Sequence, residues 1–436
     1  MKLRVPLGLC LALLTQGVSS GELLSVVNDA LAHDAELAAA NSAIAIGREE
    51  VPIARAALLP RLDGGWGRTY NQIKTDNLPT ARYWQNGWMI TLTQPVFDWE
   101  RWVALRQADI TSAKAELEYA SAWQTVVLRS ANAYLDLLAA AQEQSRASDY
   151  LNAVSEQHAL TLKLQAGGEA TLIDVQEAQS RLSEARLRQQ DALRNLDSRR
   201  RSLETLTGRD IIPPPWAPWG RTKPWLEAGS LQQWVRQAET SSFPVQLGKL
   251  EVRNASQDSE KARAQHYPVI NLSASHAPSG AASGYSEPTT TNTAMLTLSA
   301  PLFTGGANRA RLRQAMAGEE KAENRLLGAT RKSAADTREW FQRFNWARDR
   351  SQSLSEIVRL NESSLDATRQ GYQAGSRTNL DVLRAQEVVF ASRGELAKAH
   401  YEMLSAFLAL KAEVASLNLG DIQLLDNWLT ANASSR

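Results

Sequence analysis

Residues that could catalyse a reaction or bind a metal are few and scattered in this 436-residue sequence. It contains one cysteine and five histidines, which show no metal-ligand spacing: His33, His158, His266, His276 and His400. It has no HExxH motif, nucleophile elbow or phosphate loop. The glycines of residues 64–67 open an alternating pattern rather than a helix, which makes them a poor phosphate cradle. We therefore predict a protein that is not an enzyme and that uses no cofactor or metal.

The most informative polar residues stand in a phrase that the chain contains twice. Residues 168–179, GEATLIDVQEAQ, return about 207 positions later as residues 375–386, GSRTNLDVLRAQ. In each copy a glycine ends a long helical pattern, and Thr-x-x-Asp begins another in the manner of an N-capped helix. We predict an internal duplication in which each phrase is the tip of a helical hairpin. The residues of the two tip turns are Gly168, Thr171, Gly375, Thr378 and Leu380.

The first twenty residues have the pattern of a secretory signal. A basic start at residues 1–4 is followed by an apolar run at residues 5–14 and small residues at 18–20. This order predicts cleavage before Gly21 and export from the cytoplasm, and the alternative is a buried N-terminal helix. Because the single cysteine, Cys10, lies in this segment, we expect neither disulfides nor thiol chemistry in the exported chain.

Net charge and hydropathy exclude two further classes of protein. The formal charge of +1 gives no basis for binding nucleic acid through charge alone, so we expect no nucleic-acid partner. Beyond the signal, no stretch has 18 consecutive apolar residues, which excludes a transmembrane helix at the level of sequence.

Apolar residues recur at steps of three and four over most of the chain, as in long helices. Residues 98–166 contain neither proline nor glycine and predict one helix on the order of 100 Å long. Residues 21–60 and 171–206 each predict a helix about half that long. We therefore expect a long antiparallel hairpin in which two short helices lie end to end beside one long helix.

Each half also contains a stretch with the period of a β-strand. Trp84, Trp88, Ile90 and Leu92 alternate with small or polar residues, and residues 270–300 repeat the pattern. Large apolar residues on one face and small polar residues on the other are typical of a membrane β-barrel, although a soluble hairpin fits the first stretch alone. Four strands cannot close a barrel with a lumen, so several chains would have to share it.

The predicted fold is mainly α, with long α-helical hairpins that form an α-barrel and four strands per chain in a shared transmembrane β-barrel. The predicted segments are a signal peptide (1–20), a first repeat (21–210), a Pro/Trp-rich linker (211–230), a second repeat (231–420) and a short C-terminal helix and tail (421–436). The first repeat comprises a helix, a β-hairpin (62–94), a long helix (98–166) and a return helix (171–206). The second comprises a helix, a β-hairpin (270–300), a long helix (303–372) and a return helix (378–417).

Four stretches carry a family resemblance. They are residues 56–62 (AALLPRL), residues 92–98 (LTQPVFD) with Trp102 and Leu105, residues 301–306 (PLFTGG) and residues 372–383 (YQAGSRTNLDVL). Over nearly the whole chain the sequence resembles the TolC family of outer-membrane channel proteins. The resemblance implies a homotrimer whose three chains share a twelve-stranded barrel in outer-membrane lipid and whose helices form a tunnel across the periplasm. It also implies a periplasmic membrane-fusion adaptor at the tips and an inner-membrane transporter, either ABC-type or proton-driven.

The resemblance also implies roles for individual tip residues. The family's periplasmic gate matches Asp174, Tyr372 and Arg377, and the first of its two aperture aspartates matches Asp381. The second aperture position is Arg384, which puts cation block in doubt and adds a basic ring or an inter-chain ion pair with Asp381. From the residues alone, the two aspartates could instead be helix N-terminal charges, Tyr372 a packing residue and Arg377 a solvated charge.

Two functional hypotheses follow from the residues and the resemblance. The first is a passive export duct in the outer membrane. The alternative is a soluble periplasmic coiled-coil adaptor, which would share the hairpins but would not need four alternating strands at their bases. Within the first hypothesis, the absence of an acylated cysteine and the phrase at residues 94–98 with Trp102 favour type I protein secretion over dedicated drug or metal efflux. The transporter would choose the substrate, which the sequence does not name.

Overall fold

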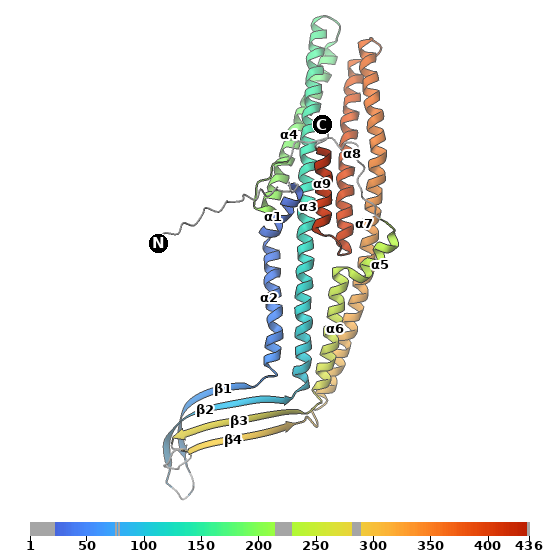
Figure 1. The fold of residues 1–436 in the computed structure, drawn as a ribbon. Helices are drawn as coiled ribbons and strands as arrows, with labels where there is room; N and C mark the ends of the chain where they lie inside the picture. The colour runs from blue at the N-terminus through green and yellow to red at the C-terminus, as the bar shows by residue number, and fades with distance from the viewer. Residues whose placement is uncertain (1–21, 75, 77–78, 214–228, 281–288, 434–436) are drawn as a thin grey trace, which may run out of the picture.

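The computed structural model describes residues 22–74, 76, 79–213, 229–280 and 289–433. The predicted signal peptide with Cys10, positions 214–228 of the predicted linker and the last three residues lie outside the described residues. Figure 1 shows a long, narrow chain with two helical hairpins side by side at one end and a four-stranded sheet at the other. The chain is mainly helical with four antiparallel strands, as predicted.

The secondary structure follows the predicted repeat. The helices are α1 (Glu22–His33), α2 (Ala35–Ala56), α3 (Trp99–Ala166), α4 (Leu172–Thr207), α5 (Leu231–Ser241), α6 (Phe243–Ala264), α7 (Ala307–Gln373), α8 (Asn379–Glu413) and α9 (Leu419–Ala433). The strands are β1 (Arg61–Ile73), β2 (Ala81–Phe97), β3 (Val269–Gly280) and β4 (Thr289–Ser299). In each half a long helix, α3 or α7, pairs with its return helix toward the tip and with a shorter helix toward the sheet (Figure 1).

Some boundaries differ from the sequence-based expectations. The helix predicted over residues 21–60 is two helices, because Asp34 takes an extended conformation and its Oδ1 accepts the N–H of Leu37 at 2.8 Å. The second long helix, predicted over 303–372, begins only at residue 307, because Gly305 and Gly306 both have positive φ. The return helix predicted over 378–417 ends at residue 413, shortly before Ala415 takes a φ of 55°.

The sheet has the order β1-β2-β3-β4, and each strand is antiparallel to its neighbour. Strand β2 continues beyond the predicted end at residue 94, through Pro95 to Phe97, and its register with β3 shifts there because proline has no N–H for the ladder. The cross-strand partners Trp66 and Trp88 lie on one face, and that face carries most of the large apolar side chains of the sheet. The other face is mainly small and polar but also carries Met89 and Met295, and the predicted alternation is confirmed.

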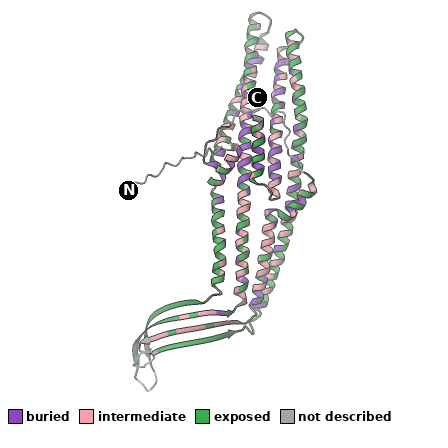
Figure 2. Ribbon diagram, in the orientation of Figure 1, coloured by how far each residue is buried: buried purple, intermediate pink, exposed green. Residues whose placement is uncertain are grey.

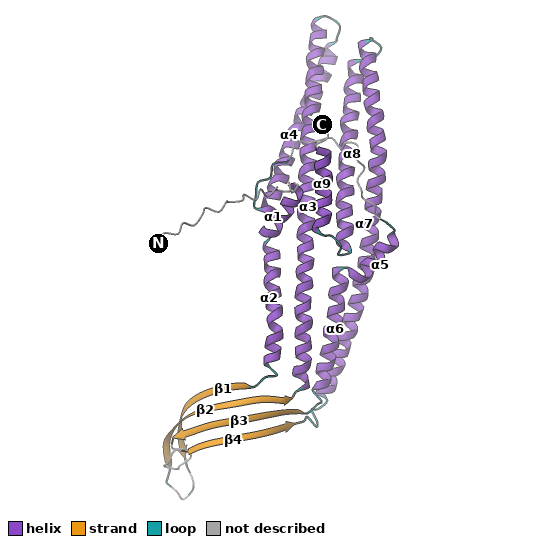
Figure 3. Cartoon of the chain, in the orientation of Figure 1, coloured by secondary structure: helices purple, strands orange, loops and turns teal. Residues whose placement is uncertain are grey.

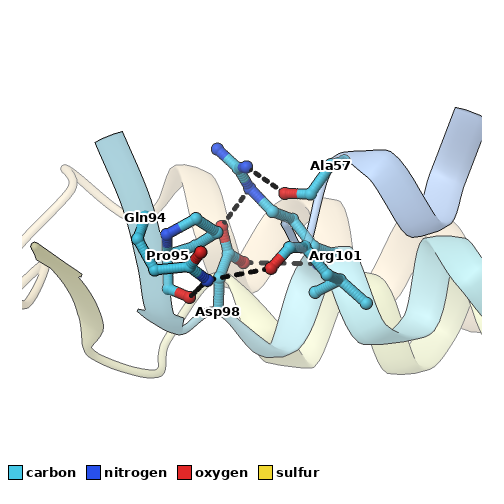
Figure 4. A network of polar contacts seen from close by, with 6 residues as sticks. Ala57, Gln94, Pro95, Asp98 and Arg101 are labelled. Carbon is cyan, nitrogen blue, oxygen red and sulfur yellow. Dashed lines mark hydrogen bonds and ion pairs between the residues drawn. The ribbon is translucent and has the colours of Figure 1, made fainter. Parts of the chain in front are cut away.

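Polar contacts fix the corner at which the sheet leaves the helices (Figure 4). Asp98 is the N-cap of α3: it accepts the N–H of Arg101 at 3.3 Å and pairs with Nε of the same arginine at 2.8 Å. The Arg101 guanidinium also donates to the carbonyl oxygen of Ala57, at the end of α2. Gln94 Nε2 donates to the carbonyl oxygen of Leu58 at 2.9 Å. The end of α2, the end of β2 and the start of α3 are therefore tied together, and Figure 3 shows the chain changing there from strand to helix.

The main apolar core lies midway along the helices, where Figure 2 shows the buried residues concentrated. Phe344 of α7 is fully buried there, with its ring centroid 5.5 Å from that of Phe407 of α8. Leu23 of α1 and Ile422 of α9 are fully buried in the same cluster. The two halves and the C-terminal helix therefore share one core.

None of the described helices combines the length and the apolar character that crossing a membrane would require.

Truncation of a core residue should destabilise the helical part of the chain. We expect Phe344→Ala to cost about 3–5 kcal/mol, because it removes a fully buried aromatic ring and leaves a cavity. Thermal unfolding followed by the far-ultraviolet circular dichroism of the helices measures this. The control Leu360→Ala alters an exposed side chain of the same helix and should cost much less. Equal losses for the two variants would contradict this assignment of the core.

Candidate functional site

The first hairpin tip joins α3 to α4 through a left-handed glycine and a capped helix start. Gly168 has a φ of 78°, a conformation that favours glycine. Thr171 is the N-cap of α4, and its Oγ1 accepts the N–H of Asp174 at 3.2 Å. In return, Oδ2 of Asp174 accepts the N–H of Thr171 at 2.8 Å. These reciprocal bonds form a capping box, which satisfies backbone donors that the helix itself leaves unpaired.

The second tip, between α7 and α8, repeats this geometry closely. Gly375 has a φ of 74°, and Thr378 is the N-cap of α8. Its Oγ1 accepts the N–H of Asp381 at 3.2 Å, and Oδ2 of Asp381 accepts the N–H of Thr378 at 2.9 Å. The helix stop, turn and capped restart predicted from the repeated phrase are therefore present at both tips.

The capping bonds hold both tip carboxylates in the charged form. The pKa of Asp174 is lowered by the hydroxyl of Thr171 and then by its backbone N–H. The pKa of Asp381 is lowered by the backbone N–H and hydroxyl of Thr378, and further by the positive charges of Arg377 and Arg384. In both boxes the capping bonds go to Oδ2, which leaves Oδ1 available to a second partner.

Tyr372 lies at the end of α7, beside the first tip. Its ring packs at the edge of a small apolar cluster formed by Leu365, Val382 and Val389. Partial burial raises the pKa of its phenol, and the negative charges of Asp174 and Glu169 raise it further. The structure thus brings Tyr372 within electrostatic range of Asp174 in one chain.

Arg377 lies in the second tip turn, against the last turn of α7. The N–H groups of Ser376 and Arg377 both donate to the carbonyl oxygen of Gly371, at 2.9 and 3.2 Å. A Cβ at Gly371 would lie 2.8 Å from Cγ of Arg377, so the arginine stem requires a glycine there. Among the described residues of the single chain, no hydrogen bond or ion pair joins Asp174, Tyr372 and Arg377 to one another.

The remaining predicted residues lie on the same surface. Arg384 is exposed one turn after Asp381, and Leu380 is half-buried at the start of α8. The first tip also presents two large apolar side chains that the sequence reasoning did not select, Leu172 and Ile173, which are 62% and 68% exposed. The tips therefore combine capped carboxylates, arginines and exposed apolar residues.

An ionic contact between the hairpins, just below the tips, was missed at the sequence level. Glu387 of α8 accepts a hydrogen bond from Arg181 of α4 through Oε2 and another from Arg188 through Oε1, each at 3.0 Å. All three side chains are partly buried. We call Arg181, Arg188 and Glu387 the inter-hairpin clamp.

Aromatic and cationic packing lies directly below this clamp. The rings of Tyr150 of α3 and Phe390 of α8 stack with centroids 4.7 Å apart. Arg146 of α3 donates to the carbonyl oxygen of Phe390 at 2.6 Å, and burial lowers the pKa of its guanidinium to about 10. A Cβ at Gly394 would meet that guanidinium, so any larger residue at this position would displace the Arg146 side chain.

A third contact ties the second tip to the first hairpin. Asn379, the first residue of α8, donates from Nδ2 to Oγ1 of Thr161 at 2.7 Å and accepts a hydrogen bond from Gln157, and both of those residues belong to α3. The repeat does not reveal these contacts, because the positions equivalent to 379 and 387 in the first half are Leu172 and Ser180, which are chemically different.

The histidines and acidic residues suggest no metal centre. Among the described residues, no group of three or more histidine, cysteine, aspartate or glutamate side chains is arranged to hold a metal ion.

Long paired hairpins, capped tips and a four-stranded sheet with one apolar face define an elongated membrane-channel subunit. The model of the family described as "Outer membrane efflux protein" matches residues 26–209 and 234–415. The chain therefore belongs to the outer membrane efflux protein family, and it is an outer-membrane efflux or secretion channel that extends into the periplasm. Channels of this family are transport proteins rather than enzymes, and the soluble adaptor hypothesis is set aside.

Individual relatives agree with this assignment. The chain is 31% identical to the proteases secretion protein PrtF of Dickeya chrysanthemi, over 93% of this chain and 90% of that protein. It is 27% identical to the alkaline protease secretion protein AprF of Pseudomonas aeruginosa (98% and 92% covered) and 26% identical to the outer membrane protein TolC of Escherichia coli (89% and 80%). The crystal structure of the outer membrane protein VceC of Vibrio cholerae matches with a TM-score of 0.78 at 20% identity, covering 90% and 96% of the two chains.

Removing the charge of Glu387 should loosen the first hairpin near its tip. In Glu387→Gln, Arg181 and Arg188 lose their shared carboxylate. Exposed or half-exposed ion pairs of this kind contribute up to about 1 kcal/mol to stability. We expect backbone amides of α4 near residues 181–188 to exchange hydrogen about five-fold faster, while the helix content is unchanged. Hydrogen exchange with mass spectrometry measures this. The control Glu356→Gln removes an exposed carboxylate that pairs only along α7, and a similar acceleration in α4 for this control would refute the clamp.

Proposed function

We propose that three copies of this chain share one twelve-stranded barrel in the outer membrane and that their helices enclose a tunnel through the periplasm. The sheet is the observation that carries this proposal. Its outer strands, β1 of 13 residues and β4 of 11 residues, have open edges. Unpaired backbone N–H and C=O groups are costly in lipid, and pairing β4 of one copy with β1 of the next removes both edges.

The two faces of the sheet support the same arrangement. The large apolar side chains would face lipid, and the threonine, serine and asparagine side chains of the other face would line an aqueous lumen. The helical end, with its two tips, would then lie in the periplasm. The fold supplies a passage, and an energy source must come from elsewhere.

The tips are the proposed contact for a periplasmic membrane-fusion adaptor protein. The turns built on Gly168, Thr171, Gly375, Thr378 and Leu380 lie at the end of the molecule farthest from the sheet (Figure 1). The exposed side chains of Leu172 and Ile173 would give such a partner apolar surface to bury. An inner-membrane transporter, ABC-type or proton-driven, would supply the energy.

The substrate class that we propose is a protein secreted by a type I system. PrtF and AprF are named for the secretion of proteases, and the alignment of each with this chain covers more than 90% of it. The phrase at residues 94–98 supports the same choice, and in this structure it forms the corner between the sheet and α3.

The proposed gate consists of Asp174, Tyr372 and Arg377 at the periplasmic entrance. In one chain Tyr372 lies near Asp174, whose Oδ1 is not used by the capping box. The three residues do not bond to one another in the single chain, so the link from Arg377 would reach Asp174 of a neighbouring copy. Asp381 and Arg384, one turn apart, would line the aperture.

Removing the Arg377 guanidinium should open the entrance. We expect Arg377→Ser to raise single-channel conductance in planar bilayers. Each exposed ion pair contributes up to about 1 kcal/mol to the stability of the closed state, so its loss should raise the ratio of open to closed channels about five-fold. The matched control Arg369→Ser removes an exposed arginine that pairs along α7 and should conduct as the wild type does.

The gate and the shared barrel can be refuted separately. Wild-type conductance of Arg377→Ser would refute the gate. The shared barrel is tested first, by running outer-membrane protein unheated and heated beside a cross-linked sample. A trimer is expected, whereas a monomer in the soluble periplasmic fraction would overturn the barrel itself.

The aperture should have a mixed rather than an acidic charge. Because Arg384 lies one turn from Asp381 and lowers the pKa of its carboxyl, a trivalent cation should block the wild-type channel weakly. We expect Arg384→Asp, which makes two acidic rings, to lower the blocking concentration of hexaamminecobalt about ten-fold or more. The neutral variant Arg384→Gln should fall between the two. Equal block of the wild type and Arg384→Asp would show that position 384 does not line the aperture.

A further inference from the structure

The apolar face of the sheet carries positive charge at one end only. On this face the described strands have two arginines, Arg68 of β1 and Arg82 of β2, both in the half nearest the hairpin loop. The strand sequences contain a single acidic residue, Asp63, which alternation places on the opposite face, where it pairs with Arg61 at 2.8 Å. The apolar face therefore has two cations and no carboxylate.

Arg68 is held within a group of aromatic residues. Its Cζ lies 4.5 Å from the ring centroid of Trp84, and the rings of Trp84 and Tyr70 are 5.2 Å apart. The direct cross-strand partner of Arg68 is Asn86, whereas Trp84 is two residues nearer the loop. The arginine side chain therefore leans toward the loop end, the direction in which a long cationic side chain extends toward a membrane interface.

The level of Arg68 along the strands agrees with a position at the lipid headgroups. Phe97 ends β2 at the corner, and Trp88 lies nine residues from it. At about 3.3 Å per residue and a strand tilt of about 40°, these nine residues rise about 23 Å along the membrane normal. That is close to the apolar band of about 25 Å in outer-membrane β-barrels. Asn86, opposite Arg68, lies at about 28 Å on the same scale and is thus just beyond the band.

We propose that Arg68, with Arg82 beyond it, binds the phosphate group of an anionic lipid in the outer leaflet of the membrane. This inference rests on the proposed insertion of the sheet with its apolar face toward lipid. A guanidinium at that level faces headgroups, and a phosphate offers it two parallel charge-assisted hydrogen bonds. The ring of Trp84 supports the other side of the guanidinium.

Native mass spectrometry of the detergent-solubilised full chain can test this inference. The probes are lipid A with two phosphates, the same lipid without phosphates, and inorganic phosphate. We expect the wild type to retain the phosphorylated lipid in preference to the other two probes. Arg68→Gln should retain about ten-fold less of it, and Arg68→Gln combined with Arg82→Gln less still. Arg68→Lys should recover part of the binding, because it restores the charge without the planar fork.

Arg61→Gln is the matched control, since Arg61 lies on the same strand but at the helical end, where it pairs with Asp63. It should bind the phosphorylated lipid as the wild type does. Equal retention by the wild type and Arg68→Gln, or equal binding of the dephosphorylated lipid, would overturn the inference. Inorganic phosphate that competes as well as the lipid would also overturn it, because the ligand would then be a free anion.

Trimer formation and bilayer conductance are measured on the same preparations. A conducting trimer that does not discriminate between the lipids would refute only the lipid site. A wild-type chain that neither forms trimers nor conducts would refute the shared barrel and the lipid site with it.

Discussion

The burial of one very long helix is the constraint on which the rest of the structure depends. Helix α3 has 68 residues, and helices in folded proteins gain most of their stability from tertiary packing rather than from propensity. Its buried apolar residues are spread along its length, from Val103 near the sheet to Val154 near the tip. They are covered in turn by α2 and α6, then α1, then α4 and α8. Both halves of the duplicated chain are therefore needed to bury a single helix.

Duplication and asymmetry have different parts in this structure. The residues that build the turns, Thr-x-x-Asp after a left-handed glycine, occur in both halves and give nearly identical capping boxes. The residues proposed to act between hairpins or between chains have no chemically similar counterpart at the repeated position. Tyr372, Arg377 and Glu387 fall in the repeat at Gln165, Ala170 and Ser180. In the proposed gate, an acidic residue of one tip can thus pair with a basic residue of the other.

The periodic features of the chain could be predicted from sequence, and the local exceptions could not. Apolar steps of three or four, strand alternation and the Thr-x-x-Asp caps each depend on a few neighbouring residues, so they gave the helices, the sheet and both tips. The break at Asp34 was hidden inside an apolar pattern that continues on both sides of it. The inter-hairpin clamp at Glu387 and the packing of Arg146 against Gly394 depend on side chains of other helices. The pattern of a single sequence does not reveal such contacts.

The capping boxes also limit how the entrance can be controlled. The folded-state pKa values of Asp174 and Asp381 are depressed, so their contribution to stability is present above the ordinary aspartate pKa and is lost only as the pH falls through the lowered values. Both carboxylates therefore stay charged across the neutral range, and their protonation would not open the proposed gate there. The contacts left to change are the proposed link from Arg377 to a neighbouring copy and the contacts between hairpins: the clamp at Glu387, the stacked rings of Tyr150 and Phe390, and the hydrogen bonds of Asn379. The proposed gate would therefore open through movement of α7 and α8 relative to the first hairpin rather than through titration of the tips.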